Sequence, residues 1–242
     1  MSQQIDKRET ARTEARYDRI APIYDLMEVL PERQFRSWRE KLWAQVPKGR
    51  VLEVGVGTGK NFPYHLPDLN VVGIDISERM LDQARQRAEE LGHPVELHQM
   101  DAQQLDFPDD VFDAAVATFV FCSVPDAVQG LRELGRVVKP GGKIFLLEHV
   151  RINEPEILGK VMDLLDPLVL RLMGPHINRR TEENVRRAGL EVARVESLAA
   201  MDLVKLIVAK PARASHGRQL NNNRYEGDGR EEAIFEEGCM DA

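Results

Sequence analysis

The sequence predicts an α/β fold built around a largely parallel sheet. Along residues 50–150, short apolar runs typical of buried strands alternate with stretches of helical character. The first run, Val51–Val54, leads into a glycine-rich turn, and two later runs are each followed by an aspartate, Asp75 and Asp101. Because ligands of such sheets bind at the carboxyl ends of the strands, we expect these polar groups to share one binding edge.

The glycine-rich turn has the spacing G-x-G-x-G, with Gly55, Gly57 and Gly59, and Glu53 stands two residues before the first glycine. Glycine adopts backbone angles closed to other residues and lets a ligand approach the main chain closely. Free N–H groups at the start of the following helix would face that ligand. A tight strand-to-helix turn without any ligand explains the same glycines, so the turn alone does not define a site.

A dinucleotide-binding turn is the main alternative for this loop. Its G-x-G-x-x-G pattern places a pyrophosphate at the helix N-terminus, as in nicotinamide-dependent oxidoreductases. Here Lys60 replaces the third glycine of that pattern, and the sequence has no Tyr-x-x-x-Lys pair. Both observations argue against an oxidoreductase.

The acid after the second run, Asp75, suits a ribose, because a carboxylate accepts hydrogen bonds on two oxygens. The alternative is that Asp75 only caps the next helix. Ser77 fits the cap better, ahead of helix formers over 78–91 and a closing Gly92.

Two longer patterns resemble those of the class I S-adenosylmethionine (SAM) methyltransferases. The turn at 53–59 resembles motif I of that family, and the block Leu131–Gly142 resembles its pattern before the fifth strand. The resemblance covers about 50–150. It implies a Rossmann-like, seven-stranded, mostly parallel sheet whose last strand is antiparallel, with strands six and seven at Glu191–Ser197 and Leu203–Ala209. The SAM-binding domain would span 47–210, behind an N-terminal helical cap at 1–46.

The resemblance implies SAM as cofactor and S-adenosylhomocysteine (SAH) as product. Glu53 and the loop glycines would organise the methionine end, Asp75 would hold the ribose, and Asp101 with Ala102 would contact the adenine. Met80 would lie under the adenine, although it is equally suited to filling the core. The residues expected to bind the cofactor are Tyr17, Glu53, Gly55, Gly57, Thr58, Gly59, Asn61, Asp75, Ile76, Met80, Asp101, Ala102 and Thr118.

The segment Tyr17–Asp25 resembles the one that precedes motif I in ubiquinone/menaquinone C-methyltransferases and bacterial phospholipid N-methyltransferases, where it folds over bound SAM. Tyr17 and Tyr24 are therefore candidate catalytic residues beside the acceptor. Their alternative role is packing within a two-helix cap. Pro22 is expected to start a helix.

The acceptor side is predicted from residues 153–182, the insertion that covers the acceptor in this family. Apolar residues cover much of a helix over 156–173, which Pro167 should kink and which is too charged to span a bilayer. This pattern indicates a lipophilic acceptor or docking at a membrane interface. A helix buried on the domain or in a dimer interface is the alternative.

Four further residues are candidates for acceptor chemistry. His149 ends the fifth strand at the ligand edge and could take the acceptor's proton, or only hydrogen-bond the cover. His176, Arg179 and Arg180 could bind an acceptor's phosphate, or cap a helix that begins near Thr181.

The acceptor atom stays open among nitrogen, sulfur and carbon. Phe121–Val124 and Leu147–Val150 resemble segments of lipid-droplet-associated thiol methyltransferases. The glycine loop and the tyrosine segment also resemble the phospholipid enzymes. We expect a phospholipid amine first, a lipophilic thiol second and a quinone precursor third. A non-catalytic SAM-binding module is a further alternative.

Composition narrows the partners. The 242 residues carry a net charge of −7, which argues against nucleic acid. Cys122 and Cys239 give neither a disulfide framework nor metal-ligand spacing, so no metal is expected.

The first twenty residues are too polar for a secretory leader, which predicts a cytoplasmic protein. Arg8, Arg12, Arg16 and Arg19 fall at helical spacing and could contact an anionic membrane. The alternative, which we favour, is a solvated charged helix or a frayed terminus. Residues 211–242 are predicted to be a disordered tail.

Overall fold

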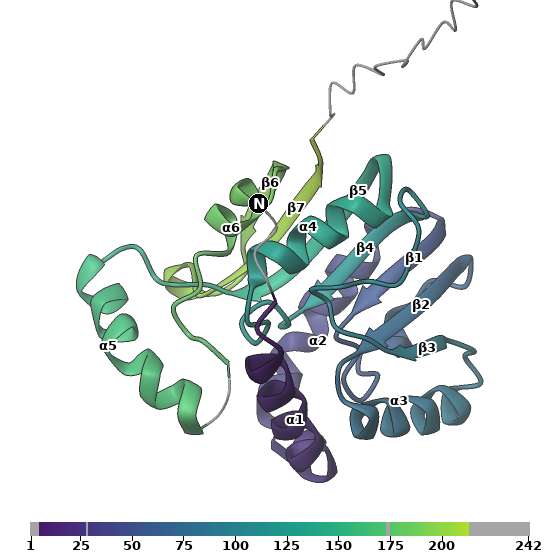
Figure 1. Ribbon diagram of the computed structural model, residues 1–242, viewed down its shortest axis with the longest axis horizontal. Helices are drawn as coiled ribbons and strands as arrows, with labels where there is room; N and C mark the ends of the chain where they lie inside the picture. Colours follow the sequence, from purple (N-terminus) through teal and green to yellow (C-terminus); the bar gives the residue numbers. More distant parts are fainter. Residues whose placement is uncertain (1–4, 28, 173–174, 213–242) are drawn as a thin grey trace, which may run out of the picture.

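The fold contains the predicted Rossmann-like sheet. A computed structural model describes residues 5–27, 29–172 and 175–212 (Figure 1). Within these residues, seven strands form one sheet in the order β3-β2-β1-β4-β5-β7-β6. The strands are β1 Gly49–Val54, β2 Leu69–Asp75, β3 Glu96–Gln99, β4 Phe112–Thr118, β5 Val138–His149, β6 Leu190–Ser197 and β7 Val204–Pro211. The tail predicted over 211–242 lies outside the described residues from 213 onward.

The strand directions confirm a mostly parallel sheet with an antiparallel last strand. β1 pairs in parallel with both β2 and β4, and β4 pairs in parallel with β5. β7 inserts between β5 and β6 and is antiparallel to both. The strand order reverses between β1 and β4, the switch point where open α/β sheets bind ligands.

Helices cover both faces of the sheet. The helices of the described residues are α1 Lys7–Met27, α2 Val29–Trp43, α3 Glu78–Leu91, α4 Ala127–Val137, α5 Glu156–Leu172 and α6 Thr181–Arg187, with short 3₁₀ turns η1 Phe62–Tyr64 and η2 Ala200–Asp202. On one face α2 buries Trp38, Leu42 and Trp43. On the other face α4 and α6 pack over β4, β5 and β7. Among the described residues, no helix is both long and apolar enough to cross a membrane.

The limits of α3 follow the sequence closely. The side chain of Ser77 accepts a hydrogen bond from the Met80 N–H, and Gly92 ends the helix in the left-handed conformation with φ 60°. Ser77, not Asp75, is therefore the N-cap, as expected. This leaves the Asp75 carboxylate available for a ligand.

The expected helix start at Pro22 is wrong. Pro22 lies inside α1, which runs without interruption from Lys7 to Met27. A proline within a helix lacks the N–H that would bond to the carbonyl of the residue four positions earlier. In this helix that carbonyl belongs to Asp18, and it accepts a hydrogen bond from Arg79 Nη1 at 3.5 Å instead. A contact from α3 thus offsets part of the cost of the proline.

Candidate active site

A cavity of about 700 Å³ opens at the carboxyl ends of β1, β2 and β4, where the strand order reverses. The structure brings most of the expected cofactor residues to its lining: Tyr17, Gly55, Gly57, Asp75, Ile76, Met80, Asp101, Ala102 and Thr118, together with the acceptor-side Tyr24. Five expected site residues do not line it: Glu53, Thr58, Gly59, Asn61 and His149.

The glycine turn leaves room for a ligand to touch the main chain. A Cβ added to Gly57, whose φ is 54°, would meet no atom within 4 Å. A Cβ on Gly55 would lie 2.5 Å from the Val120 side chain on the opposite wall. The two glycines therefore do different work: Gly55 allows the walls to approach each other, and Gly57 keeps the space above the turn open.

Asp75 holds the turn and keeps acceptor capacity. Its Oδ2 accepts the Gly57 N–H at 2.9 Å, and its Oδ1 accepts the Ser77 N–H at 2.9 Å. Each oxygen retains a lone pair that could accept from a ribose hydroxyl. Burial raises the pKa of Asp75 to about 6, against these hydrogen bonds, which lower it. The open turn and the two-oxygen acceptor fit the ribose and methionine parts of SAM.

Glu53 lies behind the cavity wall. Its side chain is fully buried, with Oε1 accepting from Asn61 Nδ2 at 2.7 Å and Oε2 lying 2.9 Å from His65 Nε2. Asn61 also donates to Thr118 Oγ1 at 3.2 Å, and Thr118 lines the cavity. The structure therefore favours a supporting role for Glu53 and Asn61, through Thr118, over direct contact with a ligand.

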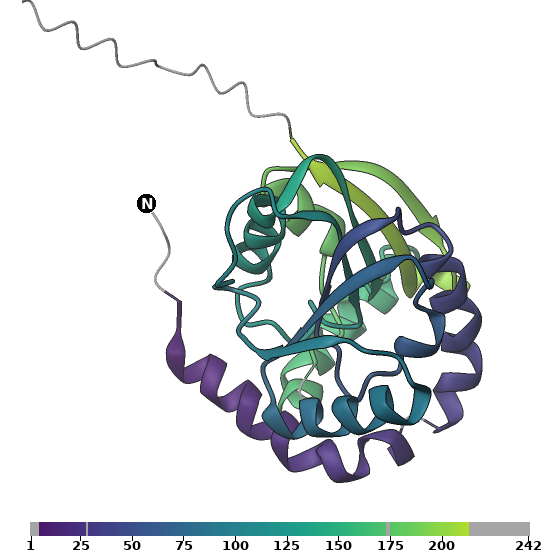
Figure 2. The same cartoon turned by 90° about the vertical axis from the view of Figure 1, so that its right-hand side faces the viewer.

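Helix α1 closes one side of the cavity and is bound to the sheet domain by its polar side chains. The Tyr17 hydroxyl lies 2.6 Å from Ser123 Oγ, and burial raises the pKa of the tyrosine. Ser77 Oγ donates to Asp18 Oδ1 at 2.6 Å, next to Asp75. Figure 2 shows α1 running alongside α3 at the lower edge of the molecule. The tyrosine segment thus lies over the cavity, as its resemblance implied.

The lower end of α1 is bound to the glycine turn. Thr58 Oγ1 donates to Asp25 Oδ1 at 2.6 Å, and Arg87 of α3 forms an ion pair with the other Asp25 oxygen. The Lys60 ammonium lies 5.8 Å from the centre of the Tyr24 ring. Thr58 therefore serves the attachment of α1 and does not face the cavity.

The wall opposite α1 is a strained segment after β4. Phe119, which lines the cavity, has φ 58°, a left-handed value unusual for a residue with a side chain. The next two N–H groups, of Val120 and Phe121, both donate to Glu148 Oε1 at 3.0 Å. Burial raises the pKa of Glu148 to about 7. Glu148 thus fixes the shape of this wall from behind.

His149 does not line the cavity, but it contacts Phe119, which does. It stacks on Phe119 with ring centres 4.5 Å apart, and Phe35 of α2 lies at 6.0 Å. Because Phe119 lies between His149 and the cavity, the structure favours a positioning role over direct proton transfer. Cys122 is buried, and burial raises the pKa of its thiol to about 12, which fits a packing role.

Some lining residues were not among those expected to bind the cofactor or to act on the acceptor. They are Thr13, Met100, Phe119, Val120, Ser123, Val124 and Pro125, with the strand ends Val54 and Ile74. The segment after β4 carried a usable signal, because it follows a buried strand at the ligand edge. Thr13 carried none, since its position depends on how α1 packs.

The insertion expected to cover the acceptor does not reach the cavity. None of the described residues between 153 and 182 lines it, and α5 stands apart from the sheet (Figure 1). Two acids attach α5 to the rest of the domain. Asp163 pairs with Arg151 at 2.8 Å, and Asp166 accepts the Ile177 N–H at 2.8 Å. Its large apolar side chains are exposed instead: Ile157, Val161, Leu164, Leu165 and Leu168.

Parts of this chain are similar to known methyltransferases. Residues 52–146 match the family described as "Methyltransferase domain". Over 103 residues the chain is 48% identical to a phosphatidylethanolamine N-methyltransferase of Cereibacter sphaeroides, covering 42% of this chain and 51% of that protein. Over 138 residues it is 41% identical to a demethylmenaquinone methyltransferase of Deinococcus radiodurans, covering 53% and 56%. The chain thus spans about half the length of these curated relatives.

Two solved structures share the fold. The [4+2]-cyclase SpnF superposes with a TM-score of 0.60 at 21% identity, covering 74% of this chain and 80% of the cyclase. A geranyl diphosphate C-methyltransferase of Streptomyces coelicolor superposes with 0.58 at 15% identity, covering 75% and 80%. Identities this low establish the fold alone. Because one neighbour is named a cyclase, the fold by itself does not define methyl transfer.

The matched domain and the curated relatives support a class I SAM-dependent methyltransferase domain with SAM as its cofactor. The two relatives bear the names of different acceptors, phosphatidylethanolamine and demethylmenaquinone. Bound SAM would supply an electrophilic methyl group to an acceptor lone pair, with SAH as the product.

Proposed function

We propose that this protein methylates the amine of a phospholipid, in the manner of a phosphatidylethanolamine N-methyltransferase. The observation that carries the proposal is the outward apolar face of α5. Leu164 is 79% exposed, Ile157 69% and Leu168 55%, whereas Asp166 of the same helix is buried and bonded to the Ile177 N–H. A helix of a water-exposed domain normally shows the opposite arrangement. Contact of this face with acyl chains would remove the exposed apolar surface from water.

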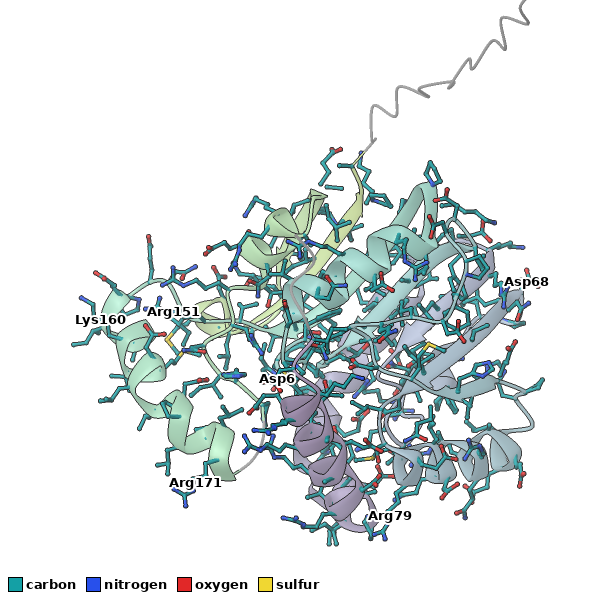
Figure 3. The ribbon with its side chains drawn as sticks, viewed as in Figure 1. Asp6, Asp68, Arg79, Arg151, Lys160 and Arg171 are labelled. Atoms are coloured by element: carbon teal, nitrogen blue, oxygen red, sulfur yellow. The ribbon has the colours of Figure 1, made fainter. Side chains whose placement is uncertain are left out.

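The named relative with phosphatidylethanolamine as acceptor supports the same choice, at 48% identity over the matched region. Lys160 and Arg171 of α5 point outward in Figure 3, where they could meet anionic headgroups beside the apolar side chains. Peripheral contact with an anionic membrane is therefore part of the proposal.

The roles proposed for the cavity residues follow from their positions. Asp75 would hold the ribose, Asp101 and Ala102 would contact the adenine, and Tyr17 and Tyr24 would exclude water beside the acceptor. The Tyr17 hydroxyl is not an evident base, since it is bonded to Ser123, and Asp75 and Asp101 would serve the cofactor. The amine would therefore arrive unprotonated, and positioning would supply most of the rate.

The test is methyl transfer from SAM labelled with a deuterated methyl group, using the full chain and three acceptors in mixed micelles. The acceptors are phosphatidylethanolamine, a demethylated naphthoquinol and a long-chain thiol. Mass spectrometry should find labelled N-methyl phospholipid as the main product. Asp75→Ala should abolish SAH binding and transfer together, which serves as the control for the site.

Other products would replace the proposal. Labelled quinol alone would make the protein a quinone C-methyltransferase, the second candidate, which the demethylmenaquinone relative favours because it matches more of this chain, 53% against 42%. Labelled thiol alone would make it a thiol methyltransferase. SAH binding without transfer to any acceptor would support a non-catalytic module.

A further inference from the structure

A second cavity, of about 570 Å³, lies among the loop after β5, the start of α6 and β7. Its charged lining is mostly basic: Arg151, Arg179, Arg180, Arg186 and Lys205 face Glu182 and Glu183. We call these residues the basic cleft. In a chain whose net charge is −7, the basic cleft reverses the overall sign. Such a reversal favours an anionic ligand.

The acids of the basic cleft do not balance its cations. Glu182 alone serves two of them, with Lys205 at 2.9 Å and Arg186 at 3.6 Å. Arg151 is neutralised by Asp163 of α5, outside the lining. Arg180, on an exposed side chain, reaches Glu183 only at 3.9 Å. Positive charge therefore remains available inside the basic cleft.

Arg179 is the group that most needs an anion. Its guanidinium forms no ion pair within 4.0 Å with any residue that the structure describes. Burial lowers its pKa, and the more distant carboxylates of Asp166, Glu148 and Asp126 offset this only in part. Its Nη2 donates to the Val124 carbonyl at 2.7 Å, and its buried Nε has no hydrogen-bond partner among the described residues. A desolvated cation with no ion pair and an unsatisfied N–H is unfavourable. An oxyanion would supply both the charge and the missing acceptor.

Arg179 also connects the basic cleft to the cofactor cavity. The Val124 carbonyl that it holds belongs to a residue lining that cavity. The basic cleft likewise adjoins α5, because Arg151 lines it and pairs with Asp163. A ligand in the basic cleft would thus lie between the helix with the exposed apolar face and the wall of the reaction site.

We propose that the basic cleft binds a phosphate group, with Arg179 as its main ligand and Arg180, Arg186 and Lys205 as supporting charges. The planar guanidinium matches phosphate oxygens in a two-bond arrangement. The source of the phosphate rests on the proposed function: it would be the phosphodiester of the phospholipid acceptor. Free inorganic phosphate presents the same oxygens, and the experiment separates the two.

The first measurement is calorimetric titration of the full chain with inorganic phosphate at low ionic strength. Arg179→Met should weaken phosphate binding at least tenfold, because it removes the unpaired guanidinium at nearly constant volume. The double variant Arg180→Gln/Arg186→Gln, whose side chains do not touch the cofactor cavity, should weaken it about fivefold. Arg85→Gln on the outer face of α3 removes a similar arginine elsewhere and should leave it unchanged.

SAH titration of each variant reports whether the fold and the cofactor cavity are intact. The double variant should bind SAH like the wild type, so the proposal can be tested even if Arg179→Met disturbs the Val124 segment. No phosphate binding by the wild type, or equal binding by the wild type and the double variant, would overturn the proposal.

The second measurement repeats the titration with soluble glycerophosphoethanolamine. Tighter binding than inorganic phosphate, with the same loss in the double variant, would assign the basic cleft to the lipid headgroup. Binding of inorganic phosphate alone would keep the site and assign it to a free anion. Both titrations are independent of turnover, so loss of the basic cleft as a site leaves the methyl transfer proposal standing, and failure of methyl transfer leaves the phosphate site standing.

Discussion

Helices α4 and α5 both carry apolar side chains at helical spacing and use them in opposite ways. In α4 the apolar side chains point to the sheet, and Leu131, Leu134 and Val137 are fully buried. In α5 the buried residues are Gly159 and Asp166, whereas Leu164, Leu165 and Leu168 are exposed. The difference shows that an apolar stripe predicts an amphipathic helix but not the direction in which it faces.

The physical reason lies in what meets each helix. α4 follows a capping residue, Asp126, whose side chain accepts the Gln129 N–H, and it packs on an apolar sheet face. α5 meets Arg151 and the 175–178 segment, which offer charges and N–H groups. Asp163 and Asp166 bond to those groups, so Leu164, Leu165 and Leu168 are left exposed. Exposed apolar surface of this kind is unfavourable in water unless another apolar surface covers it.

The largest effect should separate the two helices by stability. Leu131→Ala in α4 removes a fully buried side chain and should lower the free energy of unfolding by about 3 kcal/mol. Leu164→Ala in α5 should change it by less than about 0.5 kcal/mol, because Leu164 is 79% exposed. Urea unfolding of both variants measures the difference. Equal losses would mean that α5 packs on the domain in solution, and the comparison would fail.

The second effect should appear only on membranes. Leu164→Gln/Leu168→Gln should weaken binding to vesicles of phosphatidylethanolamine and phosphatidylglycerol about thirtyfold, since each leucine contributes about 1.5–3 kcal/mol when fully buried and part of that here. Leu91→Gln, an exposed leucine of α3, is the matched control and should have no effect. Vesicle co-sedimentation at low and high salt gives the affinities. Unchanged binding by the α5 variant would remove the main support for a lipid acceptor.

The sequence was sufficient for the features that depend on local chemistry. The limits of α3 follow from Ser77 and Gly92, and the strand ends at Asp75 and Thr118 follow from apolar runs. The position of the cavity follows from the glycine turn and from the rule that parallel sheets bind at strand ends. Each of these depends on residues close together in the chain.

Features that depend on distant partners could not be predicted. Glu53 was expected at the ligand, but its partner His65 becomes visible only once η1 folds back under the turn. Pro22 was expected to start a helix, but Arg79 from α3 accommodates it within α1. The direction of α5 depends on Arg151 and on Ile177, neither of which belongs to the helix.

A third, smaller effect tests how α5 is attached. Asp166→Ala removes the buried acceptor of the Ile177 N–H and the partner of His176, and should lower the free energy of unfolding by about 1.5 kcal/mol. The loss should be local, so hydrogen exchange should quicken in α5 and the 175–178 segment while α4 keeps its protection. Uniform quickening in both helices would show that α5 is part of the core, contrary to the comparison.

The smallest effect is a pH dependence of SAH binding in the cofactor cavity. One wall of this cavity leads into α4, whereas α5 does not line it. Burial raises the pKa of Asp75 to about 6, and ribose hydroxyls would donate to its ionised form. Protonation therefore competes with binding, so SAH affinity should be constant above about pH 7 and fall about tenfold by pH 5. Asp75→Asn should bind weakly with little dependence on pH, because it has no carboxylate to protonate. Calorimetry at pH 8 and pH 5, with circular dichroism to verify folding, measures both. Equal SAH affinity of the wild type at the two pH values would show that Asp75 does not hold the ligand in its ionised form, and the ribose assignment would have to move to another acceptor on the same edge.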